Sequence, residues 1–228
     1  MPRARRTLRM RRSRRFGSPV RISVHATGDD GILDRMVVDH VHSSDGRRRF
    51  TADEYQLMGE VGIFSPDERL ELIDGDILTM PSIKPPHAAA VDRANRTLVL
   101  ATGRNAIVRV QSPVHLHMFA EPQPDLVVLR PRDDFYASTH PGPQDILLAI
   151  EIADSSLRYD RDRKAPLYAR AGIAEYWLVD LKGQSVTCYT KPSDGAYVRS
   201  VNLQRGHTLT PALLPALTVP VDDLLAEA

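Results

Sequence analysis

The chain has 228 residues and 42% hydrophobic content, enough for one well-buried domain with an appendage. Its charge is uneven, because residues 1–21 hold nine arginines and no acid, so the net charge of +1 leaves −8 on the other 207 residues. The single cysteine, Cys188, excludes an intrachain disulfide, and no window approaches the roughly 18 apolar residues of a membrane span, which together indicate a cytoplasmic protein with no membrane partner.

Residues 1–49 predict a disordered or weakly structured leader. They have low hydrophobic density and two turn-rich clusters, TGDDG and HSSDGRRR. The arginine-dense start also fits an arm that binds nucleic acid through phosphate contacts, or a targeting segment, and these alternatives stay open. We expect the folded domain to occupy residues 50–228.

A short helix, a hairpin and a longer helix are the first elements expected in this domain. Thr51 followed by Glu54 has the capping-box form and predicts a helix through about Val61. In RLELIDGDILTM, two alternating segments flank Asp74-Gly75, a pair that tolerates the backbone angles of a tight hairpin turn. Residues 87–101 then predict an amphipathic helix that covers a sheet. Its expected inner face comprises His87, Val91, Ala94, Leu98 and Ala101.

The second half of the chain predicts a mixed sheet. AIVRVQSPVHLHM alternates like a strand with one buried face, whereas PDLVVL and DILLAIEIA are continuous apolar runs, typical of central strands buried on both faces. A helix is expected over residues 163–171, followed by the strands EYWLVD, SVTCYT and YVRSV and a short helical end, VDDLLAEA. The step from ILLAIEI through the helix to EYWLVD has the length of a right-handed crossover between parallel strands.

Two acids stand at the ends of the expected central strands. Asp125 begins PDLVVL, and Glu151 lies near the end of ILLAIEIA. If these strands are antiparallel neighbours joined by residues 130–145, the two carboxylates meet at one end of the sheet. Carboxylates in such a place are costly and repel each other unless a cation binds them. A divalent cation such as Mg²⁺, which prefers carboxylate oxygens and retains waters, would resolve both costs.

Lys164 follows Glu151 by 13 residues. Pro166 lacks an amide donor and fits near the first turn of a helix, so we expect Lys164 at the beginning of its helix. From there the ammonium group would reach back to the carboxylates and orient or deprotonate water, or neutralise charge on a phosphate. Tyr168, one turn later, would share its face.

Six pieces of the chain together resemble one known family. They are ADEYQLM, LELIDGD, the isolated His87, PQPDLVVL, LAIEIADSS and RKAPLYARAGIAEYWLVD, in this order. At these spacings the set resembles the Uma family of putative restriction endonucleases, which belongs to the PD-(D/E)XK nuclease superfamily. The resemblance covers roughly residues 50–226.

This resemblance implies an α/β fold with a restriction-endonuclease-like core, in which helices flank a mixed central β-sheet. It implies a divalent metal, Mg²⁺ with Mn²⁺ as a substitute, held by Asp125 and Glu151, and Glu71 as an outer carboxylate near the site. In the superfamily's usual pattern a lysine follows the second acid after one residue, but that position is Ala153 here. The resemblance therefore assigns the lysine role to Lys164, on the following helix.

Several other polar residues have structural interpretations beside functional ones. His87 starts the apolar face of its helix and fits a hydrogen-bonded core histidine as well as a site residue, and Glu71 fits an exposed position on a hairpin strand. Asp160 and Asp162 are interpreted as helix caps or surface charges. His115 and His117 form an HxH pair with the spacing of a transition-metal site, but without a third ligand a polar strand face is the preferred interpretation.

Three hypotheses about function follow. The first is a metal-dependent endonuclease that hydrolyses phosphodiester bonds in DNA, with Asp125, Glu151, Lys164 and Glu71 as its catalytic residues. The second is a catalytically inactive module that keeps the nuclease fold and binds nucleic acid or a partner. The third is a small-molecule metalloenzyme built on the HxH pair. Because residues 22–228 carry a charge of −8, a dependence of DNA binding on a homodimer, a partner or the arginine arm stays open.

Overall fold

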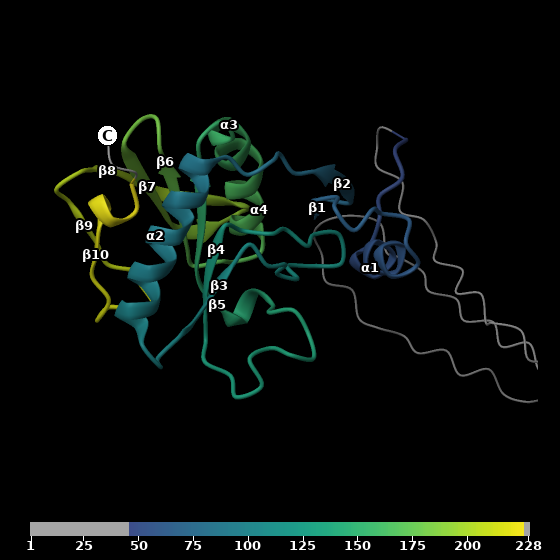
Figure 1. The fold of residues 1–228 in the computed structure, drawn as a ribbon, viewed down its shortest axis with the longest axis horizontal. Helices are drawn as coiled ribbons and strands as arrows, with labels where there is room; N and C mark the ends of the chain where they lie inside the picture. Colours follow the sequence, from purple (N-terminus) through teal and green to yellow (C-terminus); the bar gives the residue numbers. More distant parts are fainter. Residues whose placement is uncertain (1–45, 226–228) are drawn as a thin grey trace, which may run out of the picture. The chain divides into compact units, whose positions relative to one another are not determined.

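A computed structural model describes residues 46–225 of the chain (Figure 1). By its internal contacts the chain divides after Arg48, and the unit that begins at Arg49 contains all the helices and strands described below. The leader predicted for residues 1–49 lies outside the described residues except for its last four positions, and it stays a prediction.

The first elements of this unit form where their local sequence predicts them. Helix α1 (Ala52–Glu60) begins with the predicted capping box, in which Thr51 and Glu54 exchange side-chain and backbone hydrogen bonds. Strands β1 (Leu70–Ile73) and β2 (Asp76–Thr79) form the predicted hairpin. Its turn residues Asp74 and Gly75 have φ angles of 51° and 85°, the positive values that favour this pair.

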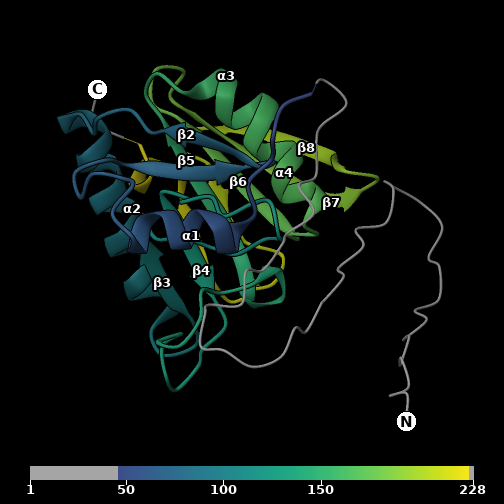
Figure 2. The same cartoon turned by 90° about the vertical axis from the view of Figure 1, so that its right-hand side faces the viewer.

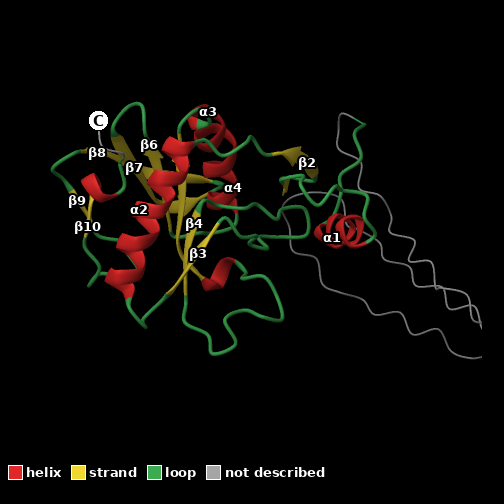
Figure 3. Cartoon of the chain, in the orientation of Figure 1, coloured by secondary structure: helices red, strands yellow, loops and turns green. Residues whose placement is uncertain are grey.

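Helix α2 extends over Pro85–Thr102, slightly beyond the predicted range at both ends. Its buried face differs from the prediction at three positions, because Ala101 is exposed, whereas Ala90 and Thr102 are buried. The Thr102 hydroxyl donates a hydrogen bond to the carbonyl oxygen of Leu98, which satisfies it inside the packed face. Figure 3 shows α2 as one continuous helix in front of the sheet.

The centre of the domain is a six-stranded mixed sheet with the order β3-β4-β5-β6-β7-β8. Strands β4 and β5 are antiparallel neighbours, as predicted, and β5 and β6 are parallel across the predicted helical crossover. The strands are β3 (Ile107–Val110), β4 (Leu126–Leu129), β5 (Ile146–Ala153), β6 (Glu175–Asp180), β7 (Ser185–Ser193) and β8 (Ala196–Gln204). Every residue of β4 and β5 is buried, which explains their uninterrupted apolar sequences.

The long strand predicted for AIVRVQSPVHLHM is wrong beyond Val110. Gln111 has a φ angle of 45° and Pro113 lacks an amide donor, so the chain leaves the sheet at this point. Val114 and Leu116 are buried, but in a different core cluster from the one that Val108 contacts. The alternation in this segment therefore does not mark one face of one strand.

The helix predicted for residues 163–171 begins earlier. It starts as α3 (Leu157–Tyr159), continues through a π-helical turn (Asp160–Lys164) and ends as α4 (Ala165–Arg170). The amide of Ala165 donates to the carbonyl oxygen of Asp160, the wider bonding of a π turn, and α4 then begins with Ala165 and Pro166. Lys164 consequently lies within the helical segment and not at its beginning.

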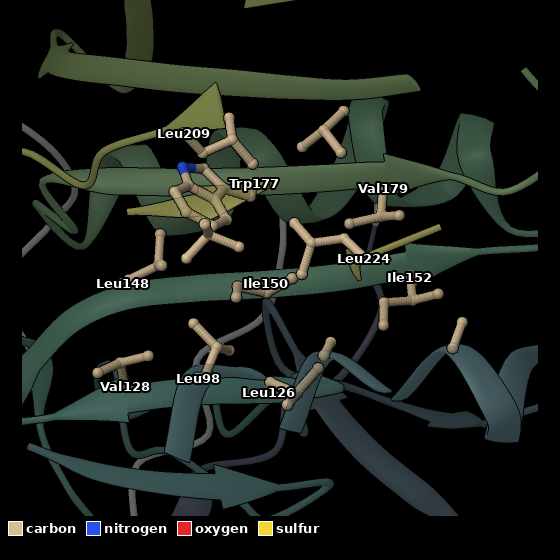
Figure 4. Packing of buried hydrophobic residues seen from close by; sticks show 14 of the residues in the cluster. Leu98, Leu126, Val128, Leu148, Ile150, Ile152, Trp177, Val179, Leu209 and Leu224 are labelled. Carbon is tan, nitrogen blue, oxygen red and sulfur yellow. The ribbon is translucent and has the colours of Figure 1, made fainter. Parts of the chain in front are cut away.

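Two core clusters fill the two faces of the sheet. One cluster joins α2 to the C-terminal segment, which contains β9 (Thr208–Leu209) and β10 (Val219–Pro220), and it includes Leu98, Ile150 and Trp177 (Figure 4). The other cluster lies under α4 and includes Leu167, Tyr168 and Tyr176. Figure 2 shows the sheet between α2 and the α3–α4 segment. This double cover holds the ends of β4 and β5 in a fixed relation, and those ends carry the two acids of interest.

Candidate active site

The register of β4 and β5 brings Asp125 beside Glu151. Leu126 pairs with Ile150, so the residue before β4 lies next to the residue after Ile150. The backbone amide of Ile152 donates a 2.9 Å hydrogen bond to Asp125 Oδ2 and fixes this carboxylate against β5. The two acids therefore lie at the C-terminal end of β5, the usual place for ligand sites in open α/β sheets.

Asp125 is held by two further donors. The His87 Nε2 atom lies 3.0 Å from Asp125 Oδ1, and the Gln111 side-chain amide donates to the same oxygen at 3.2 Å. Burial alone would raise the pKa of Asp125, but the bonds from His87 and Ile152 and the charge of Lys164 lower it below its ordinary value. Asp125 is thus a fixed carboxylate, and the residues that fix it come from α2 and the end of β3.

Lys164 lies between two buried glutamates. Its Nζ atom is 2.9 Å from Glu151 Oε1 and 3.2 Å from Glu71 Oε2, and all three side chains are at most 5% exposed. Burial would lower the pKa of Lys164, but the charges of Glu151, Glu71 and Asp160 outweigh it and raise the pKa. The group is therefore an ammonium ion that joins a hairpin, a central strand and the helical crossover.

Two tyrosines complete the bonding of the glutamates. The Tyr168 hydroxyl donates to Glu151 Oε1 at 2.8 Å, and the Tyr159 hydroxyl donates to Glu71 Oε1 at 3.3 Å. The backbone amide of Gln123 also approaches Glu71 Oε2 at 3.4 Å. Both bonds at Glu151 go to Oε1, and no described residue donates a hydrogen bond to its Oε2.

Asp160 differs from its sequence interpretation as a cap or a surface charge. It is only 3% exposed, and its carboxylate accepts a hydrogen bond from the Ser156 hydroxyl at 2.5 Å. Burial raises the pKa of Asp160 to about 6, although the charge of Lys164 opposes this shift. Asp162, by contrast, is an exposed residue paired with Arg161, as expected for a surface charge.

These groups line one cleft of about 700 Å³. One wall comes from β2 and the segment that leads into α2, and residues 154–156 and Tyr159 also line the cleft. The floor carries Glu71, Asp125, Glu151, Asp160 and Lys164. The structure therefore brings together all four residues that the sequence singled out as catalytic.

The remaining candidates divide clearly. His87 lines the cleft and is bonded to Asp125. The sequence interpretation missed Tyr159 and Asp160, which also line the cleft, and Gln111, which donates to Asp125 from outside the lining. The HxH pair lies outside both the strand and the cleft, where His115 Nδ1 approaches Glu121 at 3.4 Å. The proximity of Asp160 to Lys164, one turn apart, was the only sequence signal for the missed acid.

A divalent cation fits the chemistry of this floor. Four acidic side chains lie around one ammonium ion, and burial raises the pKa of Glu151 and Asp160 above their ordinary values. A hard cation would favour the ionised form of these acids, and carboxylate oxygens are the ligands that Mg²⁺ prefers. Within residues 46–225, no three His, Cys, Asp or Glu side chains converge closely enough to form a complete protein cage. Asp125 and Glu151 would thus hold the ion together with water molecules, as is common for Mg²⁺.

The six-stranded mixed sheet with its flanking helices defines an α/β fold of the restriction-endonuclease-like class. Residues 52–222 match the Uma2 family, described as "Putative restriction endonuclease". Because this match spans most of the chain, the protein belongs to that family, as the sequence resemblance predicted.

One solved structure supports the fold assignment. It is a putative nuclease belonging to DUF820 from Anabaena variabilis, with a TM-score of 0.60 and 17% sequence identity. The alignment covers 77% of this chain and 97% of the other. No curated protein matches the sequence. Within the part of the chain that the structure describes, no helix is both long and apolar enough to span a bilayer.

Proposed function

We propose that the protein is a metal-dependent endonuclease that hydrolyses phosphodiester bonds in DNA, with residues 50–228 as its nuclease domain. The observation that carries this proposal is the position of the Lys164 ammonium between Glu71 and Glu151, beside Asp125, on the floor of one cleft. Membership of a family of restriction-endonuclease type supports the same chemistry.

In this proposal Asp125 and Glu151 hold a Mg²⁺ ion, which Mn²⁺ can replace. When bound, the ion supplies polarisation of the phosphate and a lowered pKa of a coordinated water. The free Oε2 atom of Glu151 is the oxygen available for this purpose, since Lys164 and Tyr168 both occupy Oε1.

Lys164 has the role of charge neutralisation. Its ammonium group lies 2.9 and 3.2 Å from two carboxylates, so its position on the cleft floor is fixed before substrate binds. A fixed positive charge next to the reacting phosphate stabilises the negative charge that develops on it. Glu71 holds the ammonium from the hairpin side and acts as an outer carboxylate.

Cleavage of DNA tests the proposal directly. Plasmid and oligonucleotide DNA are incubated with Mg²⁺ or Mn²⁺ and the wild type, Asp125→Asn or Glu151→Gln, with the exposed-acid variant Asp162→Asn as the matched control. We expect loss of cleavage by about 10²-fold or more in both site variants and no change in the control. Equal cleavage by all four proteins would overturn the mechanism.

The inactive binding module is the alternative outcome of the same experiment. It predicts no metal-dependent cleavage and DNA binding that weakens steeply with salt and disappears when residues 1–21 are deleted. We also propose a cytoplasmic location, since the single cysteine suits a reducing compartment, and homodimerisation as one source of the contacts that DNA binding needs. Sedimentation of the purified chain with and without DNA measures whether it forms a homodimer.

A further inference from the structure

The size of the cleft limits what reaches its floor. A cube of 700 Å³ would be about 9 Å on an edge, whereas the major groove of B-DNA alone is about 12 Å wide. Asp125 and Lys164 have side chains only 10% and 4% exposed, so a phosphate must enter the cleft to approach them. Its volume falls in the range of about 300–1,000 Å³ that is typical of sites for small ligands.

The charges around the cleft are too few for a duplex. Besides Lys164 on the floor, the lining has two strongly basic side chains, those of Arg69 and Lys84. Residues 46–225 as a whole hold 20 basic and 23 acidic side chains. Proteins bind duplex DNA largely by neutralising phosphates with lysine and arginine, and a protein that makes about 6–10 such contacts needs more cations than this cleft has. One or two phosphates of a single strand match the cations of this cleft better.

One wall of the cleft is mainly apolar. Between Leu78 and Lys84 its side chains include Leu78, Met80, Pro81 and Ile83 together with Thr79 and Ser82, and Ile83 is 41% exposed. Next to Ile83, Lys84 stands at the N-terminal cap of α2. An apolar surface beside a cation is what an unpaired nucleotide requires, with its base against the wall and its phosphate near the charge. In a duplex the base faces are stacked and would leave this wall exposed to water.

We propose that the substrate of this site is single-stranded DNA, or an unpaired segment within a duplex, and that Ile83 contacts a base of that strand. This inference rests on the proposed function and names its substrate class. The strand enters between the Ile83 wall and residues 154–160, and one phosphate reaches the floor where Asp125, Glu151 and Lys164 lie. Arg69 and Lys84 face the neighbouring phosphates at the rim.

Three DNA substrates of one sequence test the inference in the presence of Mg²⁺ or Mn²⁺. They are a labelled single strand, the same strand annealed to its complement, and the same duplex with an unpaired central bubble. We expect the single strand and the bubble to be cut at least about tenfold faster than the duplex, with cuts in the bubble confined to unpaired nucleotides. Cleavage of the duplex at an equal or higher rate would overturn the inference and leave the proposed function standing.

Two matched variants test the apolar wall. Ile83→Ser is expected to raise the KM for the single strand about fivefold with little change in kcat, because base contacts are lost at the wall and not at the floor. Ile63→Ser, at a residue 62% exposed outside the cleft, is the control and should change neither constant. An equal KM in both variants would refute the role of Ile83.

DNA binding measured without cleavage tests the preference for single strands separately from the proposed nuclease function. Fluorescence anisotropy in EDTA compares the affinity of each protein for the single strand and for the duplex. If no substrate is cut but the single strand still binds more tightly and Ile83→Ser removes that preference, the nuclease function fails and the strand preference stands. If neither a strand preference nor an effect of Ile83→Ser is seen, the inference is wrong.

Discussion

Removal of the Lys164 ammonium is the sharpest test of the buried charge cluster. In Lys164→Met a side chain of similar length replaces the lysine, and Glu71 and Glu151 lose the cation that lies 3.2 and 2.9 Å from them. Loss of one partner of a buried ion pair costs about 3–5 kcal/mol, because the remaining charge is left uncompensated in a low-dielectric place. For a domain of this size that corresponds to a fall in Tm of about 10 °C.

Urea unfolding followed by circular dichroism and tryptophan fluorescence measures this loss. Lys182→Met is the matched control, since Lys182 is 73% exposed and lies 3.9 Å from Asp154, so its replacement should change the free energy of unfolding little. The double variant Lys164→Met/Glu71→Gln should recover part of the lost free energy of unfolding, because it removes one of the two unpaired buried carboxylates. A Lys164→Met protein as stable as Lys182→Met would refute the description of Lys164 as the cation that the two glutamates need.

Three further predictions concern His87, Cys188 and Asp160. His87→Ala should weaken Mn²⁺ binding about 10- to 100-fold in calorimetry, because His87 orients the proposed metal ligand Asp125. The control variant His140→Ala, at an exposed residue, should leave the Mn²⁺ affinity unchanged. Equal Mn²⁺ affinities of the two variants would contradict this prediction. Burial raises the pKa of Cys188 to about 12. The stability that the neutral thiol contributes is therefore complete below its unfolded pKa of about 9 and falls as the pH rises toward 12. Alkylation of Cys188 at pH 8 should be slow until urea unfolds the chain. The folded pKa of Asp160, about 6, lies above its unfolded value, so its contribution to stability is complete below pH about 4 and is lost as pH rises through 6. Asp160→Asn should therefore stabilise the protein by about 1–3 kcal/mol at pH 8 and much less at pH 4, and equal effects at both values would disprove the burial argument.

Features set by neighbouring residues were predictable from the sequence. The capping box of α1 and the Asp74-Gly75 turn depend on a few adjacent residues, and both are present. The continuous apolar sequences of β4 and β5 predict central strands, and an antiparallel pairing of these strands predicts Asp125 beside Glu151, as the structure has them. To predict that the two acids lie side by side, it was enough to know that β4 and β5 are antiparallel neighbours.

Features that depend on distant residues were not predictable in the same way. Asp160 resembles any charge in the run RYDRDRK, and only the packing of the α3–α4 segment against the sheet buries it. Gln111 reaches Asp125 because the chain turns out of the sheet at a positive φ angle. A glutamine in the sequence does not predict such an angle. The alternation across AIVRVQSPVHLHM failed as a signal of one strand, because Val108 and Val110 pack against one core whereas Val114 and Leu116 belong to the other.

The π turn at Asp160–Lys164 makes the length of this helix as important as its composition. A π turn holds one residue more than the α-helical turn it replaces, and each residue of an α-helix turns the chain by about 100°. Deletion of one residue from Arg161 to Arg163 would let the segment close as a regular α-helix, but Ser156 and Asp160 would then rotate away from Lys164 and Tyr168. Substitutions at these exposed arginines should be tolerated, whereas a change of chain length at the same place should abolish the site and leave the fold.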